Sequence, residues 1–341
     1  MASTSISKAE KSYIQAGFLS SPPLRADGRA LHDFRSVALE TGVAPLANGS
    51  ARLSIGANAH DGGGGTEVLA ATKLEVENVE EDGCDGGRIV CTVTCSPAAY
   101  PQLSSNALDD LQYDMTVILH QTLSHPSLHP NNLGILPKKK SWLLNLDIVV
   151  LADAGNIYDA IFMAARAALW DTKVPKTRSV EYKVRKGNSG GVVGGKTGSS
   201  GDMDVDEETT SGFDTRQIQQ ATDFELTDYW DEGEVLDGRE RWPISITLNL
   251  PPPTHFLDAT LPEESAVPLK ALLVYSFPPS ESPNVQAMRI LGSGELTVVL
   301  LKDLVKEGEK YARELFIALN SKLKEEDIRR NQKARERFAR R

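Results

Sequence analysis

Apolar and polar residues alternate along several segments in the first half of the chain. The alternation covers residues 36–44, 51–57 and 66–77, and it returns at 88–95. A period of two is typical of β-strands with one buried and one exposed face. Residues 141–153 form a nearly continuous apolar run, which indicates a strand buried on both faces. These segments predict a β-sheet in the first half.

Other segments place apolar residues three or four positions apart. This spacing predicts helices over 105–123 and over the strongly apolar stretch 157–171, which follows the buried strand after a turn. A short helix is predicted over 5–18, because Ser7 and Glu10 have the spacing of a capping box. Strands and helices in this mixture indicate an α+β fold class.

Apolar segments return in the second half of the chain, at 243–250, 271–277 and 295–301. A final helix is predicted from about Leu300. Its apolar stripe consists of Leu304, Tyr311, Leu315, Phe316, Leu319 and Leu323. Beyond Leu323 the residues become basic and polar, so this part of the helix is predicted to project into solvent.

A change of composition separates the two halves. Residues 183–201 contain seven glycines, and residues 202–240 contain fourteen acidic residues against two basic ones. Such a stretch has too little apolar surface to offset the entropy of ordering. Residues 185–222 are therefore predicted to be a disordered insertion.

Five parts of the chain follow from these patterns. Residues 1–23 are the N-terminal helix and a lead-in segment, 24–184 the first half, 185–222 the insertion, 223–310 the second half, and 311–341 the C-terminal helix with its basic tail.

Composition and charge narrow the function classes. The chain has 341 residues, 40% of them hydrophobic and 25% charged, which is the balance of a soluble globular protein. An apolar window long enough for a transmembrane helix is missing, and the N-terminus lacks the apolar region of a secretion signal. Cys84, Cys91 and Cys95 form no C-x-x-C pair, which argues against a disulfide framework or a zinc ribbon and indicates a reducing compartment. The net charge of −10 is concentrated in residues 202–240, so it does not describe the remaining surface.

A phosphate-binding pattern occurs within the insertion. Residues 190–197, GGVVGGKT, fit the P-loop pattern. A phosphate cradle requires a preceding strand and a following helix, whereas acidic residues follow here. We therefore interpret this run as a loop, and we interpret the glycines at 62–65 in the same way. A P-loop NTPase remains only an alternative function for the chain.

Several polar residues are candidates for binding or chemistry. His125 and His129 are separated by prolines that exclude a regular helical metal-binding pair, so no metal site is expected. The cluster Lys138, Lys139 and Lys140 is either a solvated loop or a contact for RNA phosphates. Carboxylates follow a predicted strand at Asp258, Glu263 and Glu264. Paired carboxylates can hold a metal or act as acid and base, although surface charge is the default interpretation.

Five sequence motifs together resemble the RNase PH family. They are LRADGRALHDFR at 24–35, NGSARLSIG at 48–56, EVLAATKLEVE at 67–77, LDIVVLADAGNIYDAIFMAARAAL at 146–169 and LDATLPEES at 257–265. With a helix preceding RADGR, the chain is most similar to those ring subunits of the eukaryotic RNA exosome that are related to the archaeal non-catalytic ring subunit.

The resemblance implies an RNase PH-like fold of two βαβ-type halves, with mixed sheets packed against helices. It also implies a ring of six such subunits around a channel for single-stranded RNA. Cap subunits that bind RNA and a separate hydrolytic 3′–5′ exoribonuclease are the further partners, in the nucleus, including the nucleolus, and in the cytoplasm. No cofactor, metal or membrane is expected.

Active members of the family cleave RNA with inorganic phosphate, and this chain departs from their pattern. No arginine or lysine occurs from Ser96 through Pro137, where arginines would hold RNA. The phosphate-binding Gly-Thr-Arg turn reads Gly155, Asn156 and Ile157, and isoleucine cannot replace the bidentate guanidinium.

Two acidic positions of the family pattern persist, as Asp258 and Glu264. Carboxylates without cations would repel two anionic substrates. The sequence therefore predicts a non-catalytic, structural ring subunit with a degenerate site. The alternatives are an active phosphate-dependent 3′–5′ exoribonuclease and a general RNA-binding adaptor.

Overall fold

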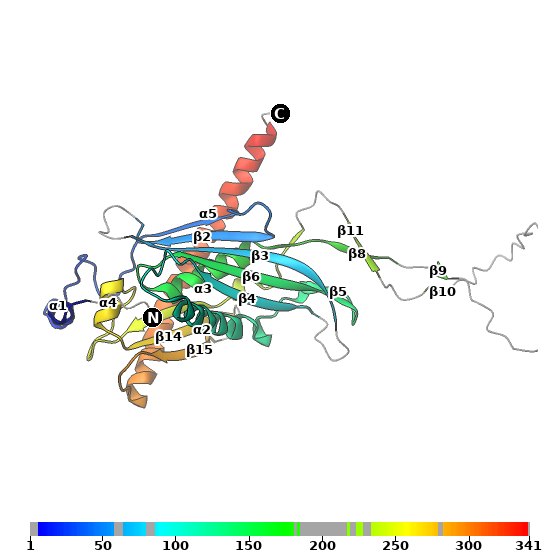
Figure 1. Ribbon diagram of the computed structural model, residues 1–341. Coiled ribbons are helices and arrows are strands. Elements are labelled where there is room, and N and C mark those ends of the chain that lie inside the picture. The colour runs from blue at the N-terminus through cyan, green and yellow to red at the C-terminus, as the bar shows by residue number, and fades with distance from the viewer. Residues whose placement is uncertain are drawn as a thin grey trace, which may run out of the picture.

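A computed structural model of the chain covers both predicted halves (Figure 1). It describes residues 6–57, 64–79, 86–180, 183–184, 217–218, 223–227, 233–278 and 282–339. Most of the predicted insertion 185–222, with the P-loop-like run 190–197, lies outside the described residues, and so does Cys84. The five-part division of the chain remains a prediction.

The larger sheet is built from the alternating segments of the first half. Its strands are β1 (Val37–Thr41), β2 (Gly49–Ile55), β3 (Thr66–Asn78), β4 (Arg88–Cys95), β5 (Gly134–Leu136) and β6 (Lys140–Ala152). The order is β1-β2-β3-β6-β4, with β5 paired to β6. The pairings are antiparallel, except that β4 lies parallel to β6. The sheet is therefore mixed, as the fold class predicted.

Two helices follow strands of this sheet. Helix α2 (Ser105–Leu123) contacts β4, and helix α3 (Ile157–Asp171) contacts β2 and β3. All fifteen residues of α3 are buried, because strand β13 (Ile244–Asn249) of the second half covers it as well. A helix that is apolar on all sides is the expected occupant of such a central position. Both helices were predicted from apolar spacing, and Cys91 and Cys95 are buried core residues as expected.

The second half forms a smaller antiparallel sheet of β13 (Ile244–Asn249), β14 (Lys270–Ser276) and β15 (Asn284–Leu291). The short helix α4 (Leu261–Ala266) lies between β13 and β14 in the chain, and the long helix α5 (Val298–Ala339) packs on both strands. Three short strand pairs make a narrow ribbon that extends away from the sheets (Figure 1). They join β7 (Lys173–Val174) with β12 (Glu234–Val235), β8 (Thr177–Val180) with β11 (Asp223–Leu226), and β9 (Lys183–Val184) with β10 (Gln217–Ile218).

The N-terminal helix α1 (Lys8–Leu19) begins with the predicted capping box, since Ser7 and Glu10 bond to each other's backbone amides. Its Phe18 stacks on Phe256 at 4.3 Å between ring centroids, which holds α1 against the second half. Short 3₁₀ turns lie at Pro126–Leu128, Asn131–Leu133 and Arg239–Arg241. Within the described part of the chain, no helix combines the length and the apolar composition needed to cross a membrane.

Two expectations for the second half need correction, and one of its strands was not expected. Residues 295–301 do not precede the final helix as a separate segment, because α5 already begins at Val298. Strand β15 was not predicted, because its apolar side chains alternate poorly and several of them are exposed. The projection of α5 also begins later than Leu323, since Asp327 accepts a hydrogen bond of 3.0 Å from the Trp170 indole.

Candidate functional site

The turn between β6 and α3 lies at the meeting point of the two halves. Gly155 has φ +101°, and a Cβ atom there would lie 2.4 Å from the carbonyl oxygen of Ala259. Asn156 also adopts the left-handed conformation, with φ 61°. Glycine is therefore required at 155 both for its backbone angle and for the close approach of the second half. This approach places the turn beside Asp258.

Asp258 is fully buried and is held by two arginines of the segment before β1. Arg35 Nη2 donates to Asp258 Oδ1 at 2.7 Å, and Arg35 Nε donates to Oδ2 at 2.9 Å. The backbone amide of Arg35 donates to the same Oδ2 at 2.7 Å. Arg29 Nη1 adds a bond of 2.9 Å to Oδ2. The carboxylate is thus bound on both oxygens by its own chain.

The ionisation of Asp258 follows from this environment. Burial by itself raises the pKa of the carboxyl group, but the hydrogen bonds and the charge of Arg35 outweigh it, so the pKa of Asp258 lies below its ordinary value. Burial acts on Arg35 in the opposite direction and lowers the pKa of its guanidinium. The hydrogen bonds and the charge of Asp258 outweigh this effect, so the pKa of Arg35 lies above its ordinary value. Asp258 is therefore ionised at neutral pH and is not available as a general acid.

Glu264 occupies the amide at the start of α3. The backbone N–H of Asn156 donates to Glu264 Oε1 at 2.9 Å, and Lys270 Nζ lies 2.8 Å from Glu264 Oε2. A helix N-terminus is a favourable place for an anion. In this chain a carboxylate of the second half fills that place, and a buried lysine neutralises it.

The neighbouring Glu263 is engaged in the same way. Arg25 binds it in a bidentate pair, with 2.9 Å from Nε to Oε1 and 2.7 Å from Nη2 to Oε2. Glu263 also accepts from the Thr260 amide at 2.8 Å, as the N3 residue of the capping box of α4. These contacts join the segment before β1 to helix α4.

The structure brings together all four residues that the sequence suggested for a degenerate site, namely Asn156, Ile157, Asp258 and Glu264. Asn156 Nδ2 donates to Asp258 Oδ1 at 3.1 Å, and Ile157 is buried at the start of α3. The expectation that these carboxylates lie without cations is wrong. Arg29 and Arg35 pair with Asp258, and Lys270 pairs with Glu264, while Arg25 pairs with the neighbouring Glu263. The arginines lie in the motif at 24–35, but no local spacing reveals which distant acid each would bind.

A cleft of about 770 Å³ opens beside this cluster. Arg29, Arg35, Asp153 and Glu263 contribute to its wall. Burial, followed by the nearby charge of Glu264, raises the pKa of Asp153 above its ordinary value. Both arginines of the wall already bind Asp258, so an anion that entered the cleft would have to compete with that carboxylate.

The sequence of residues 33–175 matches the 3′ exoribonuclease family, domain 1, which is the RNase PH family. These residues form an RNase PH domain. The matched region includes the turn with Gly155 and Asn156 and ends before Asp258, which belongs to the second half.

Curated relatives are archaeal and eukaryotic proteins. The exosome complex component Rrp42 of Saccharolobus islandicus is 33% identical over 167 residues, which are 49% of this chain and 55% of that protein. Rrp42 of Saccharolobus solfataricus is also 33% identical, over 49% of this chain and 56% of that protein. An RRP42 protein of Dictyostelium discoideum, provisionally named an exosome complex exonuclease, is 27% identical over 52% of this chain and 66% of that protein. The matches thus span little more than half the length of the archaeal relatives.

Solved structures share the fold over nearly the whole chain. A chain of the Archaeoglobus fulgidus exosome with RNA bound to the active site has a TM-score of 0.60 at 21% identity, covering 90% of this chain and 96% of that one. Rice Rrp46 has a TM-score of 0.51 at 16% identity, covering 88% of this chain and 100% of that one. These likenesses confirm the RNase PH-like fold that the sequence resemblance implied, and at such identities they establish the fold alone.

The predicted RNA-binding lysines lie far from the cluster around Asp258. Lys138, Lys139 and Lys140 stand at the start of β6, whereas the Asn156 turn follows its end. Thirteen strand residues separate these ends by roughly 40 Å at about 3.3 Å per residue. Lys140 pairs with Asp223 at 3.2 Å. Contact between these lysines and RNA remains a prediction.

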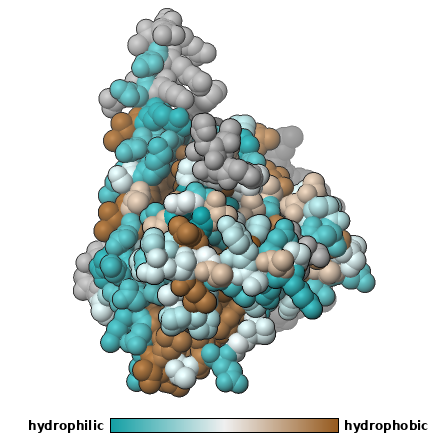
Figure 2. All heavy atoms as spheres, turned by 90° about the vertical axis from the view of Figure 1, so that its left-hand side faces the viewer, coloured by the Kyte–Doolittle hydropathy of each residue, from teal (hydrophilic) through white to brown (hydrophobic). Residues whose placement is uncertain are grey.

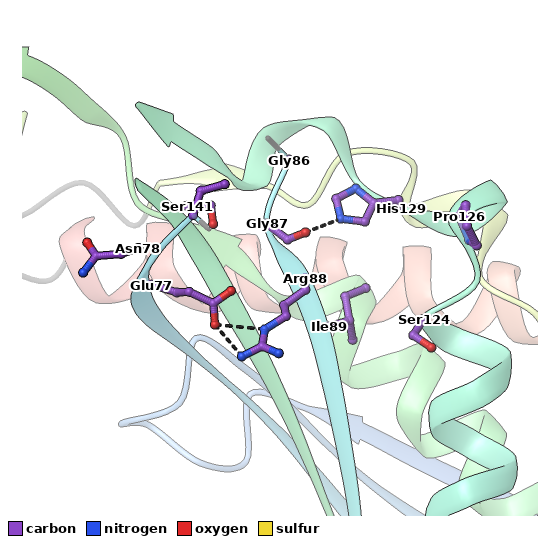
Figure 3. Close-up of a pocket in the computed structure, with 11 residues that line it drawn as sticks. Glu77, Asn78, Gly86, Gly87, Arg88, Ile89, Ser124, Pro126, His129 and Ser141 are labelled. Atoms are coloured by element: carbon purple, nitrogen blue, oxygen red, sulfur yellow. Dashed lines mark hydrogen bonds and ion pairs between the residues drawn. The ribbon is translucent and has the colours of Figure 1, made fainter. Parts of the chain in front are cut away.

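A second pocket, of about 630 Å³, lies at this far end of the sheet (Figure 3). Arg88 at the start of β4 binds Glu77 near the end of β3 through Nε at 2.9 Å and Nη2 at 2.6 Å. His129 donates from Nε2 to the Gly87 carbonyl at 2.7 Å on the opposite wall. His125, which like His129 was not expected to bind a metal, has its Nδ1 2.8 Å from the Ser127 hydroxyl. Among the residues that the structure describes, no group of three metal-binding side chains occurs.

Proposed function

We propose that this chain is a non-catalytic, structural subunit of an exosome ring. In this role its RNase PH fold completes a channel that guides single-stranded RNA to a separate 3′–5′ exoribonuclease, in RNA processing and decay. Two archaeal relatives that support the assignment are named exosome complex component Rrp42. The fold, shared with chains of archaeal exosome cores, is consistent with the same role.

The neutralised acidic cluster is the observation that carries the non-catalytic part of the proposal. Phosphorolysis requires a positively charged binding site for inorganic phosphate close to the RNA backbone. Here Arg29 and Arg35 bind Asp258, while Glu264 occupies the amide of Asn156. Phosphate would have to displace a carboxylate of the same chain from each of these donors, and Ile157 adds no charge in return.

The proposed partners follow from the same assignment. They are other RNase PH-like ring subunits, RNA-binding cap subunits, the associated hydrolytic exoribonuclease and single-stranded RNA. The proposed location is the nucleus, including the nucleolus, together with the cytoplasm. A subunit of this kind buries large apolar interfaces, so the isolated chain is expected to self-associate or to be poorly soluble.

A phosphorolysis assay tests the absence of catalysis. The full chain is incubated with poly(A) RNA and inorganic phosphate, and nucleoside diphosphates are measured. We expect no diphosphate above the level of a reaction without phosphate. Release of diphosphates that disappears in an Asp258→Asn variant, while a Glu77→Gln variant retains it, would favour the alternative of an active phosphate-dependent 3′–5′ exoribonuclease.

Co-purification of the chain from its source, followed by measurement of the intact mass of the complex, tests the structural role. We expect an assembly of nine or ten subunits. Recovery of the chain as a stable monomer would contradict the proposal.

A further inference from the structure

The turn between β1 and β2 presents uncharged, mostly apolar residues to solvent. Residues 43–47 read VAPLA, and we call them the apolar tip. Leu46 is 101% exposed, more than any other large hydrophobic side chain that the structure describes, and Val43 is 38% exposed. One exposed leucine is ordinary on a protein surface. Its meaning here depends on how the turn is held and on what it could enter.

The apolar tip is fixed by hydrogen bonds at both of its ends. The amide of Ala44 donates to the Ser50 hydroxyl at 2.8 Å, and the amide of Gly42 donates to the Ser50 carbonyl at 2.8 Å. Asn48 binds strand β3 twice, since its amide donates to that strand at 2.9 Å and its Oδ1 accepts from it at 3.0 Å. A turn fixed in this way loses little conformational entropy on binding, so Leu46 is pre-organised as an anchor.

An apolar pocket of about 380 Å³ lies between α1, the end of β13 and the start of β14. Its apolar wall consists of Leu19, Leu250, Pro251, Pro252, Val267 and Leu269. Helices α1 and α4 lie on the side of the molecule that faces the viewer in Figure 2, where hydrophobic residues gather towards the lower end. A pocket of this size and lining can accept a branched aliphatic side chain together with its neighbours.

The apolar tip and this pocket lie near opposite ends of the buried helix α3 (Figure 1). Gly49, two residues after the tip, would place a Cβ atom 2.6 Å from the Thr172 nitrogen, just beyond the end of α3. The pocket lies at the far end of α4, whose Leu261 amide donates to the Ala154 carbonyl at 3.0 Å before α3 begins. Fifteen residues of α3 span about 22 Å at 1.5 Å per residue. One chain therefore cannot place its tip in its own pocket, whereas two copies can do so head to tail.

The charges around the two larger apolar recesses favour the pocket beside α1. The pocket at the start of β4 has the ion pair between Arg88 and Glu77 in its wall, and the sequence at 80–85 adds four acidic residues. Among the described residues that line the pocket beside α1, Glu295 is the one that carries a charge. Burying Leu46 against leucine, valine and proline therefore requires little desolvation of charged groups.

We propose that the apolar tip of one copy of this chain, with Leu46 as its anchor, inserts into the pocket beside α1 of a second copy. Different surfaces of the two copies meet in such a contact, so it is heterologous. Repeated heterologous contacts close into a ring or continue as a filament. This inference goes beyond the proposed function, because it names a contact between identical chains and does not depend on the other ring subunits.

Two single variants test the contact, and each removes one side of it. Leu46→Asp places a charge on the tip, and Leu19→Asp places one in the pocket wall. Both side chains are more than half exposed, so both variants are expected to fold, and thermal unfolding checks this. Sedimentation velocity over a concentration series is expected to show oligomers of the full wild-type chain. Each variant is expected to self-associate at least about tenfold more weakly, because the contact buries these leucines.

A mixture of the two variants gives the sharpest measurement. The Leu46→Asp copy retains the pocket and the Leu19→Asp copy retains the tip, so one intact contact can form between them. We expect dimers with one copy of each variant that do not grow further. Tyr13→Asp and Ile317→Asp are the matched controls, since these side chains are 78% and 63% exposed and lie outside the tip and the pocket. Both controls are expected to associate like the wild type.

Several results would overturn the inference. They are a wild-type chain that stays monomeric, association that survives Leu46→Asp, a mixture of the two variants that stays monomeric, and controls that weaken association as much as the two variants do. Assembly with other ring subunits is measured separately by intact mass. Normal assembly without self-association through Leu46 would sink this inference alone, whereas self-association through Leu46 in a chain that joins no larger assembly would sink the proposed function alone.

Discussion

Arg35 and Asp258 are 223 residues apart in the chain, yet the guanidinium of one lies 2.7 Å from the carboxylate of the other. The Arg35 side chain is 6% exposed and that of Asp258 is fully buried. Arg35 also donates to the carbonyl oxygens of Ala154 and Gly155 at 3.1 Å. One arginine thereby joins the segment before β1, the turn before α3 and the second half. The positions that resemble a catalytic centre in sequence thus connect the two halves.

Asp258→Asn is expected to destabilise the fold by about 3–5 kcal/mol, because it leaves the buried Arg35 without its counter-charge. Glu77→Gln is the control, since its partner Arg88 has a side chain that is 62% exposed, and loss of that pair is expected to cost less than about 1 kcal/mol. Urea unfolding of both variants measures the difference. Similar small effects would show that the Arg35 pair does not hold the halves together.

The pH dependence of stability is expected to contain a contribution from Asp159 of α3. Burial raises the pKa of Asp159 from 3.8 to about 7, although hydrogen bonds from Thr247 and Ser245 oppose the rise. The folded state therefore retains a proton that the unfolded state loses. The stabilisation of the folded state by this proton is complete below pH 3.8 and is lost as the pH rises to about 7.

The Asp159→Asn variant removes this titration. Urea unfolding at a series of pH values is expected to show a steeper decline in stability between these two pKa values for the wild type than for the variant, in which the raised pKa of Asp153 still contributes. Asp258 contributes with the opposite sign. Its pKa is lowered in the folded state, so its stabilisation is present above 3.8 and is lost as the pH falls through the lower folded value. A decline of equal steepness in wild type and Asp159→Asn would refute the assignment.

Gly155→Ala is expected to cost more than Gly28→Ala. Both residues have positive φ, +101° and +75°, and a side chain in the left-handed region costs about 1–2 kcal/mol. At Gly28 no other atom lies within 4 Å of the new Cβ, so this strain is the whole cost. At Gly155 the Cβ also overlaps the Ala259 carbonyl. Thermal unfolding of both variants should therefore show the larger loss at Gly155, and equal losses would contradict the close approach of the halves.

Leu323→Ala is expected to destabilise the protein by about 2–5 kcal/mol, because the side chain is completely buried where α5 meets the body. Ile317→Ala is the matched control on the same helix. That side chain is 63% exposed, and its truncation is expected to change stability by about 0.5 kcal/mol or less. Chemical denaturation separates the two, and a small effect at Leu323 would mean that α5 detaches readily.

Local patterns predicted most elements of the fold. The helices Ser105–Leu123 and Ile157–Asp171 have the bounds that apolar spacing indicated, because helical periodicity depends on residues only a few positions apart. Strand β15 escaped prediction because Val285, Met288 and Ile290 are partly exposed on an edge strand, where little burial shapes the sequence. The acids and the turn of the candidate site were found by motif, whereas the arginines of the motif at 24–35 were not recognised as the partners of these acids.

The sequence by itself determined the long strands of the larger sheet, the buried helix, the isoleucine in the turn before that helix and the basic residues near the C-terminus, since each of these is a matter of residue type and of spacing within a few turns. Only the tertiary structure decided that Arg25, Arg29 and Arg35 meet Glu263 and Asp258, and that Glu264 fills the amide of Asn156. Such pairs form when the two halves dock. Their distances depend on the packing of both sheets around α3, which no local pattern encodes.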